Sequence, residues 1–286
     1  MTSTLSTDHP GWHTGKSGNL VRLVLHDDVP WLAVWEPGTG LRLSPIGSDD
    51  ATAPPAPRVS PHELPNTVAA APLVRRLVAL GDVQRLTNPS LWDALTSGFL
   101  RQIVIAGQAR LAYRRWCTKG QCVETPAGPL FLVPDAESVL NRPDEEFMGA
   151  GTKFQSAKLR TAAVAYLKHG SVWKRLAPDE LVRALQEIPG IGPWTAGAVA
   201  ADYTGDFSLY PHGDPAIRGR VSRVLPGVSL PARDEALALK WRGLANHSRR
   251  QLHALTLYTL TWGTGARSDV AQALATSHRP FPPPTY

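Results

Sequence analysis

Asp214 is a carboxylate whose surroundings in the sequence would hold it in a fixed place. It follows the glycine- and proline-rich loop 210–213 and directly precedes Pro215, so it is a good N-cap for a helix that starts there. A capping position fixes the side chain. A fixed carboxylate can stabilise a cation that develops at C1′ of a sugar, or orient a water molecule against it. The alternative is a purely structural cap. Asp206, in the turn 204–206, is the nearest rival carboxylate.

A glycine hairpin, 189–193, lies upstream of Asp214. The apolar stripe in 181–188 predicts a helix before it, and a second helix is expected to begin at its end. Gly190 and Gly192 can bring bare backbone N–H groups to the start of that helix, which is a favourable place for an anion. The chain has a formal net charge of +6, so a phosphate of nucleic acid is the natural anion. An ordinary turn between two helices is the alternative.

The order of hairpin, loop and aspartate resembles the signature of the helix-hairpin-helix (HhH-GPD) DNA glycosylases. The stretch 191–196, Ile-Gly-Pro-Trp-Thr-Ala, also fits the I-G-x-W-T-A pattern of the 3-methyladenine DNA glycosylase II (alkylbase) branch. The resemblance covers roughly 77–268. It implies a mainly α fold: a glycosylase bundle of two helical subdomains with a cleft, preceded by a small N-terminal antiparallel β domain. It also implies base excision repair, in which a damaged, alkylated base is flipped out of duplex DNA and its N-glycosidic bond is hydrolysed.

The resemblance gives Asp214 and Trp194 particular roles. Asp214 would be the catalytic carboxylate, 20 positions after Trp194. Trp194 stands where base-excising lyases of the superfamily carry a nucleophilic lysine. An indole cannot form a Schiff base, so the enzyme is expected to be monofunctional, without lyase activity. Trp194 and Tyr258 match positions at which the alkylbase branch holds the flipped base on aromatic faces. Core packing is the alternative for both rings.

Six residues are expected to contact DNA. The hairpin would hold a phosphate through backbone amides and a hydroxyl, a glutamine followed by an apolar residue would fill the gap left by the flipped base, and a loop histidine would touch DNA or shape the loop. They are Gly190, Gly192 and Thr195 at the hairpin, Gln102 and Ile103 on an early helix, and His212 in the loop. A buried helical isoleucine and a structural histidine are the alternatives.

No cofactor or metal is expected, apart from a structural monovalent cation that such hairpins often hold between carbonyls and a phosphate. Cys117 and Cys122 are the two cysteines of the chain. Two thiolates cannot supply the four ligands of an iron–sulfur cluster, which sets this chain apart from the endonuclease III and adenine-mismatch branches. Their C-x4-C spacing, without a second pair, also disfavours a zinc site.

The composition fits a DNA-binding enzyme of the cell interior. The chain has 286 residues, of which 43% are hydrophobic, enough for a substantial core. We find no signal peptide and no apolar run of the roughly 20 residues that a membrane span needs. The expected partner is double-stranded DNA with a damaged or modified base, and the expected state is a cytoplasmic, nucleoid-associated monomer.

Five regions are expected along the chain. Polar, β-rich, proline-rich and helical patterns follow one another. They predict a flexible tail over 1–17, a small antiparallel β-rich region over 18–47, a proline-rich linker over 48–71, the helical glycosylase domain over 72–277 and a proline-rich tail over 278–286. Within the helical domain, one long helix is predicted from Ser90 towards Cys117.

Two other functions remain open at this point. A non-catalytic helix-hairpin-helix module would keep the hairpin but not the chemistry. An N-glycosidase acting on a free nucleoside or an unusual modified base would use the same aspartate without gripping a duplex.

Overall fold

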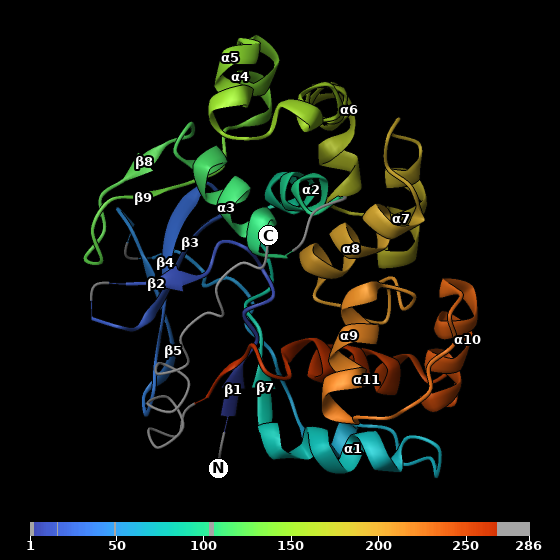
Figure 1. Ribbon diagram of the computed structural model, residues 1–286. Helices are drawn as coiled ribbons and strands as arrows, with labels where there is room; N and C mark the ends of the chain where they lie inside the picture. Colours follow the sequence, from blue (N-terminus) through green and yellow to red (C-terminus); the bar gives the residue numbers. More distant parts are fainter. Residues whose placement is uncertain (1–2, 16, 49, 103–105, 268–286) are drawn as a thin grey trace, which may run out of the picture.

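The computed structural model describes residues 3–15, 17–48, 50–102 and 106–267. In this part of the chain, eleven α-helices lie beside two four-stranded sheets and a short hairpin. Figure 1 shows the sheet formed by β2 to β5 on one side of the molecule and the helices on the other. This arrangement confirms the expected mainly α fold with an N-terminal antiparallel sheet. None of the helices described is long and apolar enough to cross a bilayer.

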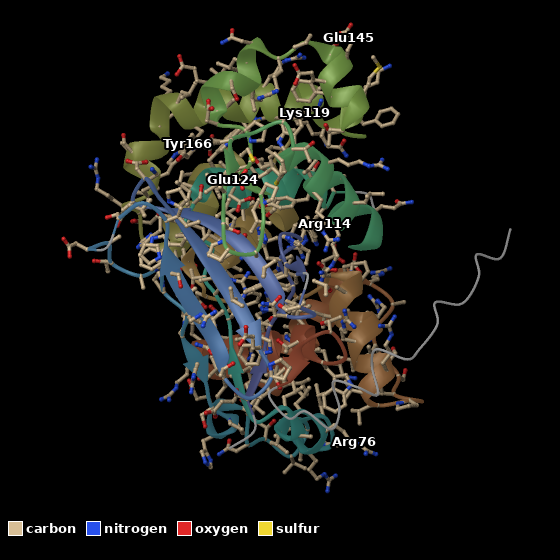
Figure 2. The ribbon with its side chains drawn as sticks, turned by 90° about the vertical axis from the view of Figure 1, so that its left-hand side faces the viewer. Arg76, Arg114, Lys119, Glu124, Glu145 and Tyr166 are labelled. Atoms are coloured by element: carbon tan, nitrogen blue, oxygen red, sulfur yellow. The ribbon has the colours of Figure 1, made fainter. Side chains whose placement is uncertain are left out.

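The predicted β-rich region is an antiparallel sheet. It consists of β2 (His13–Thr14), β3 (Leu20–His26), β4 (Val29–Glu36) and β5 (Gly40–Pro45), joined in that order. Residues along β4 alternate between its two faces, and both faces are covered, so the strand is nearly continuous in apolar residues. The hairpin of β8 (Cys122–Val123) and β9 (Leu130–Phe131) covers one face. Figure 2 shows it lying over the sheet, where Glu124 marks it.

The prediction of a flexible N-terminal tail is wrong. β1 (Ser3–Leu5) pairs in parallel with β7 (Asp82–Gln84) and antiparallel with β10 (Ala266–Arg267). Leu5 and Trp12 are buried among the apolar residues beneath the β3–β5 sheet. The polar composition of this segment hid its role, because the side chains of Thr4, Ser6, Thr7 and His9 are buried inside the protein.

The segment 48–71 is not a free linker either. β6 (Arg58–Val59) pairs antiparallel with the other edge of β7, and the short 3-10 helix η1 (Pro61–Glu63) follows it. Val59 and Leu64 are buried in the apolar cluster formed by the second group of helices, which is described in the next paragraph. The segment is therefore anchored to the fold at separate points, while other residues, such as Val68, stay exposed.

The helices form two groups, as predicted, with α8 (Pro193–Thr204) between them (Figure 1). Each group of helices has its own apolar cluster. One face of α8 contributes Ala196, Val199 and Ala200 to the cluster of the first group, and the other contributes Ala198 and Ala201 to that of the second. Small side chains let both groups approach the helix closely. The first group comprises α2 (Leu91–Leu100), α3 (Ala106–Cys117), α4 (Ala136–Asn141), α5 (Asp144–Gly149), α6 (Ser156–Trp173) and α7 (Pro178–Gln186). The second comprises α1 (Ala71–Leu77), α9 (Pro215–Val224), α10 (Asp234–Leu244) and α11 (Arg249–Thr261).

The single long helix predicted from Ser90 to Cys117 is in fact two helices, α2 and α3. Ser90 caps α2 as expected, accepting a hydrogen bond from the N–H of Asp93 at 3.2 Å. Leu91, Leu95 and Phe99 on α2 are fully buried. Arg101 is the C-cap of α2. The next residue, Gln102, contacts the glycine hairpin through its side chain. Ile103 lies outside the described residues.

Candidate functional site

The glycine hairpin joins α7 to α8 where the sequence predicts. Gly190 has φ +89°, a conformation that side chains with a Cβ rarely adopt, so the turn requires glycine there. Gly192 is the N-cap of α8 and has φ −88°, and a Cβ added to it would meet only open space. Its backbone is exposed at the start of a helix, where the N–H groups lack internal partners. This end of α8 can therefore receive an anion without moving any protein atom.

The aspartate loop lies directly against α8. A Cβ on Gly197 would come within 2.6 Å of the carbonyl oxygen of Leu209, so this glycine permits the close approach of loop and helix. Asp214 then caps α9, with its Oδ1 accepting from the N–H of Ala216 at 2.6 Å. Its exposed fraction is 6%. The loop thus holds the carboxylate in one orientation beside α8.

Trp194 links the carboxylate to the hairpin. Its indole Nε1 donates to Asp214 Oδ2 at 3.0 Å, and the hydroxyl of Tyr210 donates to the same oxygen at 2.7 Å. Because Trp194 is in the first turn of α8, the carboxylate and the hairpin lie at the same end of this helix. Asp206, the rival carboxylate, is instead paired with Arg249, its Oδ2 lying 2.7 Å from the Nη2 of that side chain.

Gln102 connects the end of α2 to the hairpin. Its Nε2 donates to Thr195 Oγ1 at 2.7 Å and to the carbonyl oxygen of Gly190 at 3.2 Å. Lys158 on α6 donates through Nζ to Gln102 Oε1 at 2.7 Å. The structure therefore brings together three predicted DNA-binding residues from distant parts of the sequence. It adds Lys158, whose place in a helix of repeated lysines and arginines gave no local sign of this contact.

Phe154 is a second residue that the sequence did not single out. It lies in the 3-10 helix η3 (Lys153–Gln155), one turn before Lys158, and 92% of its surface is exposed. A phenylalanine at the start of a helix usually indicates core packing. Only the structure shows that this ring faces solvent.

Two of the predicted contact residues are buried. The hydroxyl of Tyr258 lies 2.8 Å from the carbonyl oxygens of both Val59 and Gly81, which share its one proton, and the side chain is fully buried. It therefore joins α11 to the segments on both sides of α1, and its stacking role stays a prediction. His212 has an exposed fraction of 6%. Burial, followed by the nearby charge of Arg242, lowers its pKa to about 4. Its exposed fraction equals that of Asp214, and its predicted DNA contact stays a prediction.

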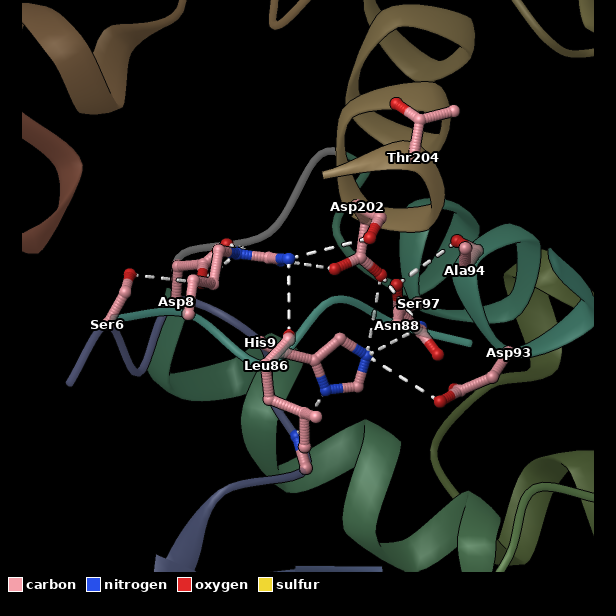
Figure 3. Close-up of polar contacts among 12 residues, drawn as sticks. Ser6, Asp8, His9, Leu86, Asn88, Asp93, Ala94, Ser97, Asp202 and Thr204 are labelled. Carbon is pink, nitrogen blue, oxygen red and sulfur yellow. Dashed lines mark hydrogen bonds and ion pairs between the residues drawn. The ribbon is translucent and has the colours of Figure 1, made fainter. Parts of the chain in front are cut away.

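A second polar cluster lies behind the site and fastens the N-terminal segment to the helices (Figure 3). Asp8 pairs with Arg85 at 3.0 Å, and Arg85 also pairs with Asp202 on α8. His9 Nε2 lies 3.7 Å from Asp202 Oδ2 and 3.7 Å from Asp93 Oδ2. Burial raises the pKa of Asp93 to about 6, although Arg22 opposes this shift. These ion pairs explain why a polar N-terminus is ordered.

The described surface also has a cavity of about 590 Å³ between the N-terminal segment and α3. Its lining includes Trp12, Arg110, Tyr113 and Phe131, but neither Asp214 nor Trp194. No group of three or more histidine, cysteine, aspartate or glutamate side chains is placed to hold a metal ion within the part of the chain that the structure describes.

The fold is that of the helix-hairpin-helix DNA glycosylases. The chain is similar to a 3-methyladenine DNA glycosylase from Archaeoglobus fulgidus, with a TM-score of 0.65 and 18% identity over 86% of this chain and 87% of that one. It is also similar to an 8-oxoguanine glycosylase/lyase from Clostridium acetobutylicum in complex with DNA, with a TM-score of 0.63 and 14% identity over 90% and 88%. No family model matches the sequence, and no curated protein matches it.

Proposed function

We propose that this protein is a monofunctional DNA glycosylase that removes a damaged, alkylated base from duplex DNA. The proposal is supported above all by the carboxylate of Asp214, which is capped, oriented by Trp194 and placed at the same end of α8 as the glycine hairpin. A phosphate held at the hairpin would bring the neighbouring sugar towards this carboxylate. Asp214 would then stabilise the positive charge that develops at C1′ as the base departs, and orient the water that adds there.

The absence of a lysine at position 194 supports hydrolysis without strand cleavage. The indole N–H of Trp194 is already donated to Asp214, so this position supplies no amine to attack C1′. Alkylated purines that carry a positive charge are good leaving groups, and their release does not require a strong general acid. Lys158 is the amine beside the hairpin, and it serves as the control in a trapping experiment.

The DNA contacts are proposed from the hairpin outwards. Gly190 and Gly192 would offer backbone N–H groups to a phosphate, with a monovalent cation held by the hairpin carbonyls as a further proposal. The hydroxyl of Thr195 accepts from Gln102, so its own proton can be donated to the phosphate. Lys158 adds a positive charge beside them. Ile103 remains the proposed residue that fills the gap in the base stack.

A panel of lesion-bearing duplexes tests the function. The purified protein is incubated with duplexes that each contain one damaged base, and abasic sites are revealed by alkaline cleavage. We expect release of alkylated purines by the wild type, no release by Asp214→Asn, and no adduct trapped by borohydride. Duplex binding with no release of any base would favour the non-catalytic module. Release from free nucleosides alone would favour the nucleosidase.

A trapped adduct would contradict the monofunctional mechanism. If it disappeared in Lys158→Ala, the amine beside the hairpin would be its source. If it persisted in that variant, another amine would have to reach C1′.

A further inference from the structure

Arg101 and Tyr210 form a hydrogen-bonded chain that ends on Asp214. Arg101 Nη2 lies 3.3 Å from Tyr210 Oη, and Tyr210 Oη lies 2.7 Å from Asp214 Oδ2. Tyr210 has an exposed fraction of 2%, and its ring stacks on that of Phe207. We propose that Arg101 and Tyr210 are positioning residues that determine which oxygen of Asp214 faces the substrate. This proposal rests on the glycosylase function proposed above.

The chemistry of the two partners fixes the direction of the chain. A guanidinium group has donors and no acceptor, so Arg101 must donate to the phenolic oxygen of Tyr210. The single proton of the phenol is then directed to Asp214, which can only accept when it is ionised. A residue at position 101 that could accept a hydrogen bond would give this proton a second place to go.

The two oxygens of Asp214 are therefore left in different states. A carboxylate oxygen has two lone pairs. Oδ2 accepts from Tyr210 and from Trp194, so both of its lone pairs are used. Among the residues described, Oδ1 accepts only from the N–H of Ala216, so one lone pair remains. Oδ1 is thus the oxygen that meets the developing charge at C1′ or the attacking water.

The surroundings keep Arg101 charged and in place. Burial acts against the charge, but Tyr210 and the carboxylates of Asp8, Asp202 and Asp214 outweigh it, so the pKa of Arg101 is raised. Asp8 and Asp202 are themselves fixed by Arg85. Asp8, in the N-terminal segment, thereby helps to hold the charge of Arg101, the residue at the far end of this hydrogen-bonded series from Asp214.

The first test uses rates of base release in single turnover. Tyr210→Phe keeps the ring but removes the donor, and we expect it to release the base about 10-fold more slowly, the size of one hydrogen bond to a charged group. Its affinity for a duplex with an abasic-site analogue should stay within about twofold, because the chain acts on the reacting carboxylate and not on DNA. Tyr113→Phe is the matched control, since it removes another buried tyrosine hydroxyl from an aspartate, Asp93 at 2.8 Å.

Variants of Arg101 test the direction of the chain. Arg101→Lys keeps a group that can only donate, so its rate should fall by less than about threefold, whereas Arg101→Gln can also accept and should fall further. Arg101→Gln should cost little when added to Tyr210→Phe, because the two residues act through one hydrogen bond. The proposal would be overturned if the rate losses of Arg101→Gln and Tyr210→Phe were fully additive. It would also be overturned if Tyr210→Phe and Tyr113→Phe lowered the rate of base release equally.

A second test does not need activity. The indole N–H resonance of Trp194, assigned by its loss in Trp194→Phe, is followed by NMR in the free protein. In Tyr210→Phe the indole becomes the sole donor to Oδ2 among the described residues, so its resonance should move downfield, while Tyr113→Phe should leave it in place. An unmoved resonance in Tyr210→Phe would overturn the proposal. A wild type that releases no base from any duplex would instead refute the glycosylase function.

Discussion

Asp214 and Asp202 are both buried at the ends of α8, but they are satisfied in opposite ways. Asp202 faces the guanidinium of Arg85 and the amide of Asn88, which donates to it at 2.8 Å (Figure 3). Asp214 is contacted directly only by neutral donors in the described structure: an indole, a phenol and a backbone N–H. The first arrangement neutralises a charge inside the protein. The second holds a charge in place without cancelling it.

This difference distinguishes a structural carboxylate from one that suits the proposed catalytic role. A buried ion pair compensates the loss of hydration of both partners, and little net charge remains for a third group. Neutral dipoles stabilise a carboxylate while leaving its net charge to act on a cation that forms beside it. Arg101 is hydrogen-bonded to the hydroxyl of Tyr210 and not to Asp214 itself. The neutral phenol therefore separates this positive charge from the carboxylate.

The comparison is tested most severely by Asp214→Asn. The amide keeps the size of the side chain and loses the charge, so base release should fall by a factor on the order of 100 to 1,000, while binding to duplex DNA should persist. Single-turnover assays and binding titrations measure the two effects. A variant that keeps more than about a tenth of the wild-type rate would remove the functional role of this carboxylate.

The structural cluster is tested by pH. The pKa of Asp93 is raised by burial to about 6, above its ordinary value of 3.8, so folding favours the protonated form. Its contribution to stability is fully present below pH 4 and is lost as the pH rises through 6. The change amounts to about 3 kcal/mol from the shift of roughly two pKa units. Denaturant unfolding at pH 4 and pH 7 should show that this loss is missing in Asp93→Asn.

His9 sets the background for that measurement. Burial and the charge of Arg22 hold its pKa well below the ordinary range, so folding favours the neutral imidazole and stability falls as the pH drops. The wild type and Asp93→Asn share this contribution, and the difference between their stabilities isolates Asp93. If the difference is the same at both pH values, Asp93 does not titrate in this range.

Tyr258→Phe tests the boundary between core and site. Losing the hydroxyl leaves the buried carbonyls of Val59 and Gly81 without this donor, so unfolding should become easier by about 1–2 kcal/mol. Base release should stay within about twofold, because the side chain is fully buried away from Asp214. Thermal unfolding and the lesion assay measure the two outcomes. A selective loss of activity at unchanged stability would restore the stacking role.

Gly192→Ala should have the smallest effect on the stability of the free protein. The added methyl group meets open space in the free protein, so stability should change by less than about 1 kcal/mol. The same space is where the proposed phosphate sits, so affinity for DNA should fall by about tenfold. Gly190→Ala is the contrasting variant: its φ of +89° predicts a loss of stability before any loss of binding.

The site was predictable from the sequence where local rules decide it. The hairpin, the capping role of Asp214 and the small residues of α8 follow from glycine, proline and helix-cap preferences that act over a few residues. The contact of Gln102 with the hairpin was not predicted. The family resemblance placed Gln102 at the gap left by the flipped base, and no local pattern joins residues 93 positions apart. The roles predicted for His212 and Tyr258 rest on matching spacing, which does not reveal on which side of the backbone a side chain is buried.

The N-terminal region was mispredicted for a different reason. Polarity favours solvent exposure, but His9 is buried and Asp8 is half-buried. Asp8 is bonded to Arg85, the residue after β7, and His9 lies beside Asp202 on α8. A single sequence does not show such pairing, because each charge looks solvated until its partner is placed. Likewise, the polarity of 101–102 did not reveal that a helix ends there, since the side chain of Gln102 is satisfied by the hairpin.

The position of β1 has a consequence for how the chain acquires its structure during synthesis. This strand precedes every other described element in the sequence, yet one of its two neighbours is β10, and the hydroxyl of Thr7 donates to the carbonyl oxygen of Thr264 at 2.6 Å. Contacts of such long sequence separation slow folding, because the intervening chain must be ordered before they form. The pairing of β1 with β10 can form only after nearly all of the described helices have been translated. Completion of this sheet therefore requires that the chain has been made through β10.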